Sequence, residues 1–154
     1  MSDATKPPEA KIAPDAPSAE TRRRARGHWE QAVESLRQAR KAAKSGDALQ
    51  SGYLSLQGAI NALRALCMLY GHMQPPAYSP SALAALLAAE APELAALAEP
   101  SNALEAIQAL NPFAAQRDPA AERHQAAEAL AHGDAVLSQV RAHLKANRTL
   151  FFAP

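Results

Sequence analysis

Residues 47–71 carry the longest helical pattern in the chain, and this pattern limits the fold to packed helices. Seven apolar residues, which we call the apolar stripe, recur there at alternating spacings of four and three: Leu49, Tyr53, Leu56, Ile60, Leu63, Cys67 and Tyr70. Such spacing places side chains on one face of an α-helix. Asp47 suits the N-cap, and Gly71 suits the left-handed position after the last turn. We therefore predict a helix whose stripe is covered by other helices.

Two further long helices are predicted, one on each side of the first. Residues 21–44 repeat apolar and small side chains at helical spacing, and the link 45–47 is short enough to form an antiparallel hairpin with the next helix. The last long helix begins at Asp118-Pro119, because Asp is a good N-cap and Pro suits the first turn. Gly133 on its apolar face indicates either a close approach between helices or a kink.

Prolines confine the intervening segment to short helices. We expect one helix over 82–90, capped by Ser79 or Ser81, and a second that begins near Ser101. Because a proline inside a helix removes a hydrogen bond and clashes with the preceding turn, we expect breaks at Pro92, Pro100 and Pro112. The predicted fold is all-α, an antiparallel bundle of three long and two short helices.

The pattern divides the chain into a bundle domain, residues 21–149, between two tails. Residues 1–20 carry four prolines and few large apolar side chains, so this segment cannot bury enough surface to offset its ordering entropy. We predict that it is disordered. Residues 150–154 form an apolar tail that either folds back on the bundle or docks on a partner.

Composition excludes several classes of protein. The formal net charge is +1, so no field of the whole molecule favours nucleic acid. Cys67 is the single cysteine, which rules out a disulfide within the chain, and its place on the stripe indicates a buried hydrophobic residue. The chain lacks a long apolar run and a signal-peptide pattern, so we predict a cytoplasmic protein that does not span a membrane.

Three motifs follow one another in a characteristic order. Gln57-Gly58-Ala59 precedes Leu63-Arg64-Ala65-Leu66 on the central helix, Gly71 leads through a proline-containing link to a Leu-rich helix over 83–87, and Phe113 and Arg117-Asp118-Pro119 precede the last helix. In this order, over residues 25–146, the chain resembles the HEPN family. It departs from the family pattern at Ile60, where many members carry glutamate, and at Phe113 and Asp118, which replace tyrosines; the family's histidine before the short helix is also absent.

The resemblance implies a helical bundle that pairs as a homodimer and binds nucleotide or RNA, in some members beside a minimal nucleotidyltransferase. It also implies candidate residues. The RNase branch of the family carries an arginine followed within a few positions by a histidine, and here Arg117 precedes His124 by seven positions. Histidine titrates near neutral pH and arginine binds phosphate through its forked guanidinium, so this pair could cleave RNA without a metal. Arg64 and Asp118 join Arg117 as candidate phosphate-site residues.

Three functions therefore stay open at this stage. The first is a binding protein for nucleotide or RNA, the second a toxin-type, metal-independent RNase using Arg117 and His124, and the third a scaffold or adaptor bundle without a ligand. We expect no cofactor and no metal site. His124, His132 and His143 share a broad face of the last helix, but neighbours in this set are separated by roughly 12 and 16 Å of helix rise, too far to hold one ion.

Overall fold

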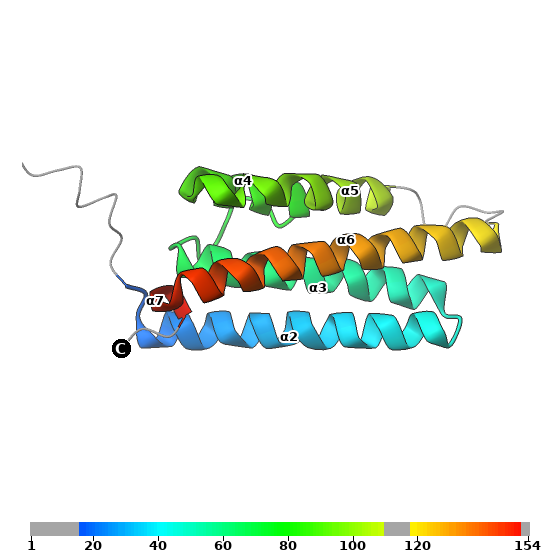
Figure 1. Ribbon diagram of the computed structural model, residues 1–154, viewed down its shortest axis with the longest axis horizontal. Helices are drawn as coiled ribbons and strands as arrows, with labels where there is room; N and C mark the ends of the chain where they lie inside the picture. Colours follow the sequence, from blue (N-terminus) through cyan, green and yellow to red (C-terminus); the bar gives the residue numbers. More distant parts are fainter. Residues whose placement is uncertain (1–15, 110–117, 152–154) are drawn as a thin grey trace, which may run out of the picture.

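The computed structural model describes residues 16–109 and 118–151, and every regular element in these ranges is a helix. The elements, labelled as in Figure 1, are α2 (Ala19–Lys44), α3 (Ala48–Leu69), α4 (Pro80–Glu90), the 3₁₀-helix η2 (Pro92–Leu97), α5 (Ala98–Ala109), α6 (Pro119–Ala146) and α7 (Arg148–Phe151). The predicted all-α class, with three long and two short α-helices, is confirmed. The 3₁₀-helix η2 and the single turn α7 were not predicted.

The helices form an antiparallel bundle in three layers (Figure 1). α2 makes one outer layer, α3 and α6 lie side by side in the middle, and α4, η2 and α5 make the other outer layer. α3 runs antiparallel to α2, the α4–α5 segment returns along the bundle, and α6 runs in the same direction as α3. One end of the bundle therefore holds the starts of α3 and α6, and the opposite end holds the start of α2 and the end of α6.

Side-chain caps determine where the helices begin. Asp47 Oδ1 accepts a hydrogen bond from the backbone N–H of Gln50 at 3.1 Å, and Asp118 Oδ1 accepts one from Ala120 at the same distance. Both caps were predicted. Gly71 follows α3 with φ of 94°, a left-handed conformation that glycine adopts without steric cost. The predicted boundaries of α3 and α6 are therefore confirmed by their local chemistry.

Three predicted boundaries need correction. The tail was expected to extend to residue 20, but α2 begins at Ala19 because the Ser18 hydroxyl accepts a hydrogen bond from the Thr21 N–H at 3.0 Å. Pro100 was expected to break a helix, yet it is buried in the first turn of α5, where a missing N–H is tolerated. Leu150 belongs to α7 and packs against the core. Residues 1–15 and 152–154 of the predicted tails lie outside the described residues.

The prediction that other helices cover the whole apolar stripe is wrong for its first half. Leu49 is 54% exposed and Tyr53 is 58% exposed, whereas Leu63 is fully buried. The buried residues in the first half of α3 are small ones: Ser51, Ser55, Gly58 and Ala59. Small side chains let α3 approach its neighbours closely, so the contact with α2 and α6 follows this small-residue face and leaves the large side chains of the first two turns in solvent.

Glycines mark the two closest helix contacts. A Cβ on Gly58 would overlap the side chain of Leu36 on α2, and a Cβ on Gly133 would lie 3.2 Å from the carbonyl oxygen of Ser55 on α3. Gly133 therefore serves a close approach of α6 to α3, the first of the two alternatives that the sequence left open. These contacts hold the three long helices together along their middle.

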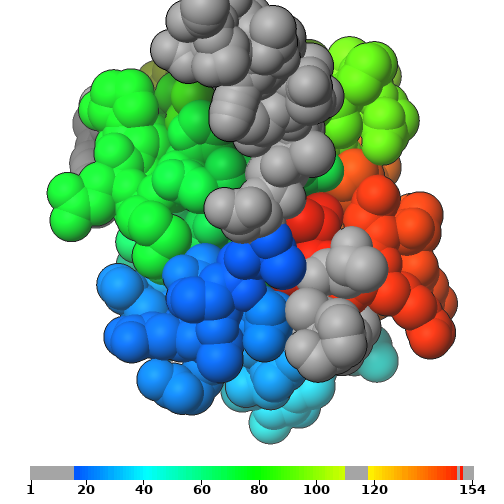
Figure 2. All heavy atoms as spheres, turned by 90° about the vertical axis from the view of Figure 1, so that its left-hand side faces the viewer, coloured from blue at the N-terminus to red at the C-terminus, as the bar shows by residue number. Residues whose placement is uncertain are grey.

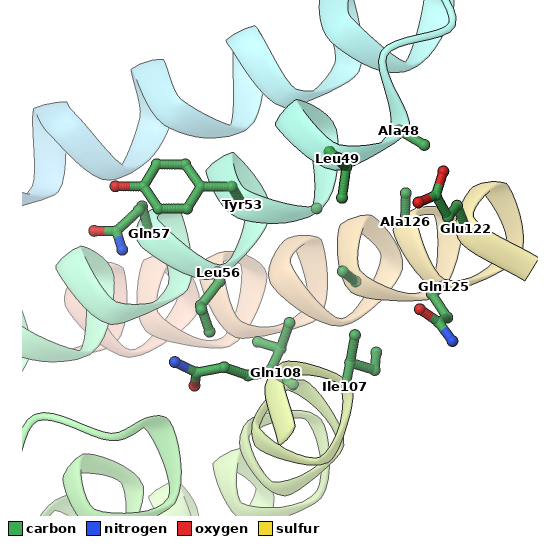
Figure 3. Close-up of a pocket in the computed structure, with 13 residues that line it drawn as sticks. Ala48, Leu49, Tyr53, Leu56, Gln57, Ile107, Gln108, Glu122, Gln125 and Ala126 are labelled. Carbon is green, nitrogen blue, oxygen red and sulfur yellow. The ribbon is translucent and has the colours of Figure 1, made fainter. Parts of the chain in front are cut away.

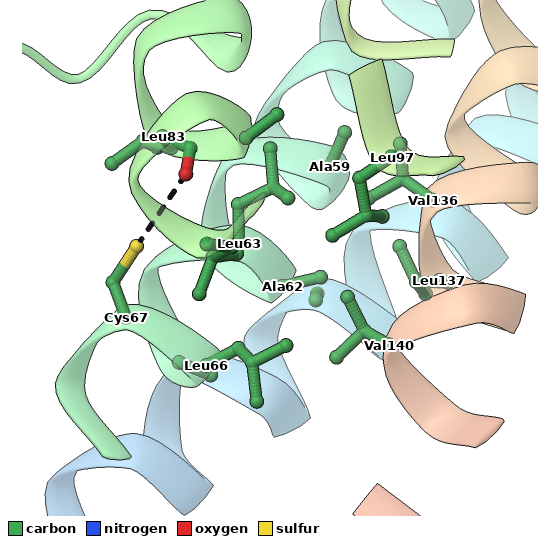
Figure 4. Packing of buried hydrophobic residues seen from close by; sticks show 14 of the residues in the cluster. Ala59, Ala62, Leu63, Leu66, Cys67, Leu83, Leu97, Val136, Leu137 and Val140 are labelled. Carbon is green, nitrogen blue, oxygen red and sulfur yellow. Dashed lines mark hydrogen bonds between the residues drawn. The ribbon is translucent and has the colours of Figure 1, made fainter. Parts of the chain in front are cut away.

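The largest buried side chains gather where α3 meets α4, η2 and α6 (Figure 4). This part of the core includes Leu63, Leu66, Leu83, Leu97, Val136 and Val140. Cys67 is fully buried there, with its sulfur 3.9 Å from the Leu83 carbonyl oxygen, and burial raises the pKa of this thiol to about 12. A thiol with this pKa stays protonated at neutral pH. Cys67 thus acts as a small hydrophobic residue, as predicted.

Candidate functional site

An open groove of about 390 Å³ lies between the starts of α3 and α6 and the end of α5 (Figure 3). We call it the α3–α5–α6 groove. Its volume falls within the range of small-molecule pockets, roughly 300–1,000 Å³. The lining residues are Ala48, Leu49, Gly52, Tyr53, Leu56, Gln57, Leu104, Ile107, Gln108, Glu122, Gln125, Ala126 and Ala129. They include the exposed half of the apolar stripe. The stripe prediction failed there because no helix covers these side chains, and the same uncovered space is the groove.

The groove exists because small residues leave space beside large ones. Gly52 on α3 lies against Ala126 on α6, where an added Cβ would still be 3.9 Å from the Ala126 Cα. Ala126 and Ala129 present only methyl groups to the groove, and Leu104 and Ile107 of α5 line its other side. The result is an apolar floor with Tyr53 on its rim.

Polar side chains reach the groove from all three helices. Gln57 comes from α3, Gln108 from α5 and Gln125 from α6, and Glu122 adds a carboxylate from the first turn of α6 (Figure 3). A glutamine amide has one acceptor oxygen and two donor hydrogens. No lysine or arginine lines the groove among the described residues. The lining therefore suits a flat, neutral group with polar edges better than a buried phosphate.

The predicted catalytic pair is only partly described. Arg117 lies outside the described residues. His124 is on α6 with a side chain that is 74% exposed, and its Nε2 lies 3.5 Å from a carboxylate oxygen of Glu128 one turn further along. Asp118 caps α6, where its carboxylate accepts a hydrogen bond from the backbone N–H of Ala120.

Arg64 lies far from His124 within the chain. Its guanidinium packs over the ring of Tyr78, with the carbon 4.6 Å from the ring centroid, in a cation–π contact. Since Gly52 and Ala126 are opposite each other, helix geometry separates Arg64 from His124 by roughly 20 Å along the bundle. The fold of the single chain does not bring these two predicted residues together.

Sequence reasoning missed a buried polar cluster at the opposite end of the bundle from the groove. His143 of α6 is only 5% exposed, and its Nε2 lies 2.7 Å from the Tyr70 hydroxyl at the end of α3. Its Nδ1 lies 3.6 Å from Glu93 of η2, and Asn147 caps the same turn. The prediction grouped His143 with the exposed His124, because both lie on a broad face of one helix. The structure separates them, since η2 covers α6 only near its C-terminal end.

Burial controls the ionisation of this cluster. Desolvation lowers the pKa of His143 below its usual value, although the nearby Glu93 carboxylate acts in the opposite direction. Burial also raises the pKa of Tyr70, and the charges of Glu93 and Glu90 add to that effect. His143 is therefore mostly neutral at pH 7, and its Nε2 lies within hydrogen-bond distance of the Tyr70 hydroxyl. This is the arrangement of a satisfied core histidine.

We predict that His143 makes the protein less stable in mild acid. Because its folded pKa lies below the unfolded value near 6.5, the unfolded chain binds the proton first as the pH falls. The free energy of unfolding is then largest above about pH 6.5 and decreases as the pH drops toward the folded pKa. Urea titrations of the parent and of His143→Gln at about pH 7.5 and pH 5.5 test this. An equal loss of stability in both proteins would assign the effect to other groups.

The described residues contain neither a metal-binding cluster nor a membrane-spanning helix. In residues 16–109 and 118–151, no three side chains of His, Cys, Asp or Glu are placed to hold a metal ion. Within the same ranges, no helix combines the length and the apolar character that crossing a bilayer requires. Comparison with models of known protein families, with curated proteins and with solved structures found no match to this chain. The resemblance to the HEPN family stays a prediction.

Proposed function

We propose that this chain is a HEPN-like binding protein that holds a nucleoside, free or as part of a nucleotide or RNA, in the α3–α5–α6 groove. The observation that carries the proposal is the combination of an apolar floor, an exposed aromatic ring and amides from three helices around one cavity of about 390 Å³. A purine or pyrimidine base is flat, has an apolar face and carries donors and acceptors on its edge. The groove offers a partner for each of these features.

Tyr53 supplies the stacking surface. Its ring is 58% exposed on the groove rim, so a base can cover it without displacing a packed side chain. Base stacking on aromatic side chains contributes about 1–3 kcal/mol per base. Leu56 and Ile107 line the groove beside it and can contact the same ligand.

The polar lining supports a base and a ribose rather than a phosphate. Gln57 and Gln108 can each donate to and accept from a base edge, as amides do in nucleic-acid recognition. Glu122 suits a ribose hydroxyl, since a carboxylate accepts hydrogen bonds from hydroxyl groups and repels a phosphate at the same place. Phosphates of a bound nucleotide would then extend out of the groove. A contact between phosphate and Arg117, Asp118 or Arg64 stays a prediction.

Calorimetric titration of the full chain tests the proposal. We expect adenosine, guanosine, cytidine or uridine to bind saturably, and the corresponding monophosphate to bind with similar affinity, because the base and ribose carry the recognition. Heat signals absent for all nucleosides would contradict the proposal. Binding that appears only with di- or triphosphates would also contradict it and would point to a phosphate site elsewhere.

The RNase alternative has less support. His124 is exposed beside Glu128 and does not line the groove, and its predicted partner Arg117 lies outside the described residues. The adaptor alternative gives no role to the glutamine amides that surround the groove. A homodimer, a nucleotidyltransferase partner and a cytoplasmic location stay predictions that accompany the family resemblance.

A further inference from the structure

Charge is divided unevenly between the outer layers of the bundle. α2 carries eight basic residues, Arg22, Arg23, Arg24, Arg26, Arg37, Arg40, Lys41 and Lys44, against the three acidic residues Glu20, Glu30 and Glu34. Residues 80–109, which form α4, η2 and α5, carry four glutamates and no lysine or arginine. The small net charge of the chain therefore hides a basic layer and an acidic layer on opposite sides of α3 and α6 (Figure 1).

One group of basic residues lies at the end of the bundle where α2 begins and α6 ends. Six exposed residues form what we call the terminal basic surface: Arg23, Arg24 and Arg26 on α2, Arg141 and Lys145 on α6, and Arg148 on α7. Figure 2 faces this end and shows the start of α2 beside α6 and α7. Residues 141–151 contain no acidic side chain.

Packing brings the two groups of cations together. The Arg141 guanidinium lies over the Trp29 ring, with the carbon 5.4 Å from the centroid, so α6 meets α2 at this level. Arg26 precedes Trp29 by one helical turn, and Lys145 follows Arg141 by one turn. Because α2 and α6 are antiparallel, Arg26 and Lys145 lie on the same side of this contact, toward the end of the bundle.

This placement works against the stability of α2. The N-terminus of a helix is the positive end of its dipole and favours acidic residues. The first turn of α2 has one acidic residue, Glu20, but the first two turns also carry four arginines. The Arg22 guanidinium donates to the Pro17 carbonyl oxygen, whereas Arg23 and Arg24 have no ion-pair partner among the described residues. A local conflict of this kind is typical of a functional surface.

We propose that the terminal basic surface binds the phosphate backbone of nucleic acid. Five of its six cations are arginines, whose planar fork matches phosphate oxygens in a bidentate geometry. A helix that binds a membrane surface needs exposed apolar side chains beside its cations. The large apolar side chains exposed in the described residues are Val33, Leu49, Tyr53 and Tyr78, and none of them belongs to this surface. Among the described side chains this charge has no apolar anchor, which favours nucleic acid over a bilayer.

The surface is independent of the proposed nucleoside groove. The groove lies at the opposite end of the bundle, where α3 and α6 begin. The acidic α4–α5 layer repels a polyanion, so nucleic acid would approach from the α2 side and contact the end of the bundle. A backbone contact of this kind carries no sequence preference.

The test is the salt dependence of binding to a fluorescent oligouridine RNA, measured by anisotropy between about 50 and 200 mM salt. The variant carries Arg23→Gln, Arg24→Gln and Lys145→Gln. If each of these residues neutralises one phosphate, the slope of log Kd against log salt concentration decreases by about 2. The control carries Lys41→Gln, Lys44→Gln and Arg123→Gln, which remove the same charge at the other end of the bundle and should change the slope far less.

Three results would overturn the proposal. Equal slope changes in both variants would show an effect of net charge alone. Failure of the parent to bind RNA at about 50 mM salt would remove the nucleic-acid assignment. The parent protein could also bind anionic vesicles and not RNA. If the first variant then loses vesicle binding, the surface belongs to a membrane contact. Nucleoside titration of the same variants tests the groove separately. The groove residues are unchanged in both variants, so nucleoside affinity should stay the same whether or not the terminal basic surface binds RNA.

Discussion

Replacing Leu36 by alanine is expected to lower the free energy of unfolding by about 2–5 kcal/mol, the range for truncation of a buried leucine. Leu36 is fully buried on α2. Its two terminal carbons occupy the space above the glycines of both neighbouring helices, Gly58 on α3 and Gly133 on α6. Loss of these carbons opens a cavity at the point where the three long helices meet.

The pair Leu36 and Gly58 gives this prediction a sharper form. Gly58→Ala alone should destabilise by about 1–3 kcal/mol, since its new methyl group overlaps the Leu36 side chain. In the Leu36→Ala background the overlap with Leu36 is removed, while the methyl group still lies 3.2 Å from the Ala32 carbonyl oxygen, so the cost should become smaller without vanishing. Urea unfolding of the four proteins measures the coupling between the two sites.

Gly27→Ala is the matched control for this cycle. Gly27 lies in α2, and a Cβ there would meet nothing within 4 Å. Alanine should therefore stabilise the helix by about 0.5–1 kcal/mol. Additive effects of Leu36→Ala and Gly58→Ala would contradict the close contact between α2 and α3 that the structure shows.

Replacing Tyr53 by alanine is expected to weaken nucleoside binding by about 5- to 150-fold, which corresponds to the loss of 1–3 kcal/mol of base stacking. Tyr53→Phe keeps the ring and should keep most of the affinity. Because the side chain is largely exposed, neither change should alter the thermal melt by more than a small amount.

Tyr78 provides the control for this substitution. It is also an exposed tyrosine, at 43%, but it packs with Arg64 rather than on the groove. Tyr78→Ala should leave nucleoside affinity unchanged. If Tyr78→Ala weakens binding and Tyr53→Ala does not, the ligand binds near Arg64, and the groove is not its site.

The fold was largely predictable because its helix ends carry strong local signals. Asp47, Gly71 and Asp118-Pro119 act through their own backbone or through residues next to them, so the sequence alone contains the relevant chemistry. The start of α2 was placed too late because both Ser18 and Thr21 can cap a helix, and only the observed hydrogen bond from the Thr21 N–H to Ser18 distinguishes them.

The stripe misled the prediction because hydrophobic periodicity gives most weight to large side chains. α3 packs instead through Ser51, Ser55 and Gly58, which have helical spacing but little hydrophobicity. A search for small residues at spacings of three and four would have found this face. The face of α3 that meets the long helices is then decided by close contacts with Leu36 of α2 and Gly133 of α6. These contacts depend on the tertiary structure.

The candidate site was less predictable than the fold. The groove combines residues from three helices that are separated by tens of positions, and it depends on where α5 ends relative to the starts of α3 and α6. No short sequence motif predicts this arrangement of three helices. The environment of His143 was equally hard to predict. Only contacts with Tyr70 and Glu93, which come from other elements, distinguish it from an exposed helical histidine.

Chemical-shift mapping by NMR during a nucleoside titration tests the central proposal most directly. We expect saturable shifts of backbone and methyl signals in residues 48–57 of α3, 104–108 of α5 and 122–129 of α6, the segments that line the groove. Signals of Arg64, Tyr78 and the terminal basic surface should stay unchanged. Shifts that cluster at Arg64 and Tyr78 while the groove signals stay fixed, or the absence of any saturable shift, would contradict it.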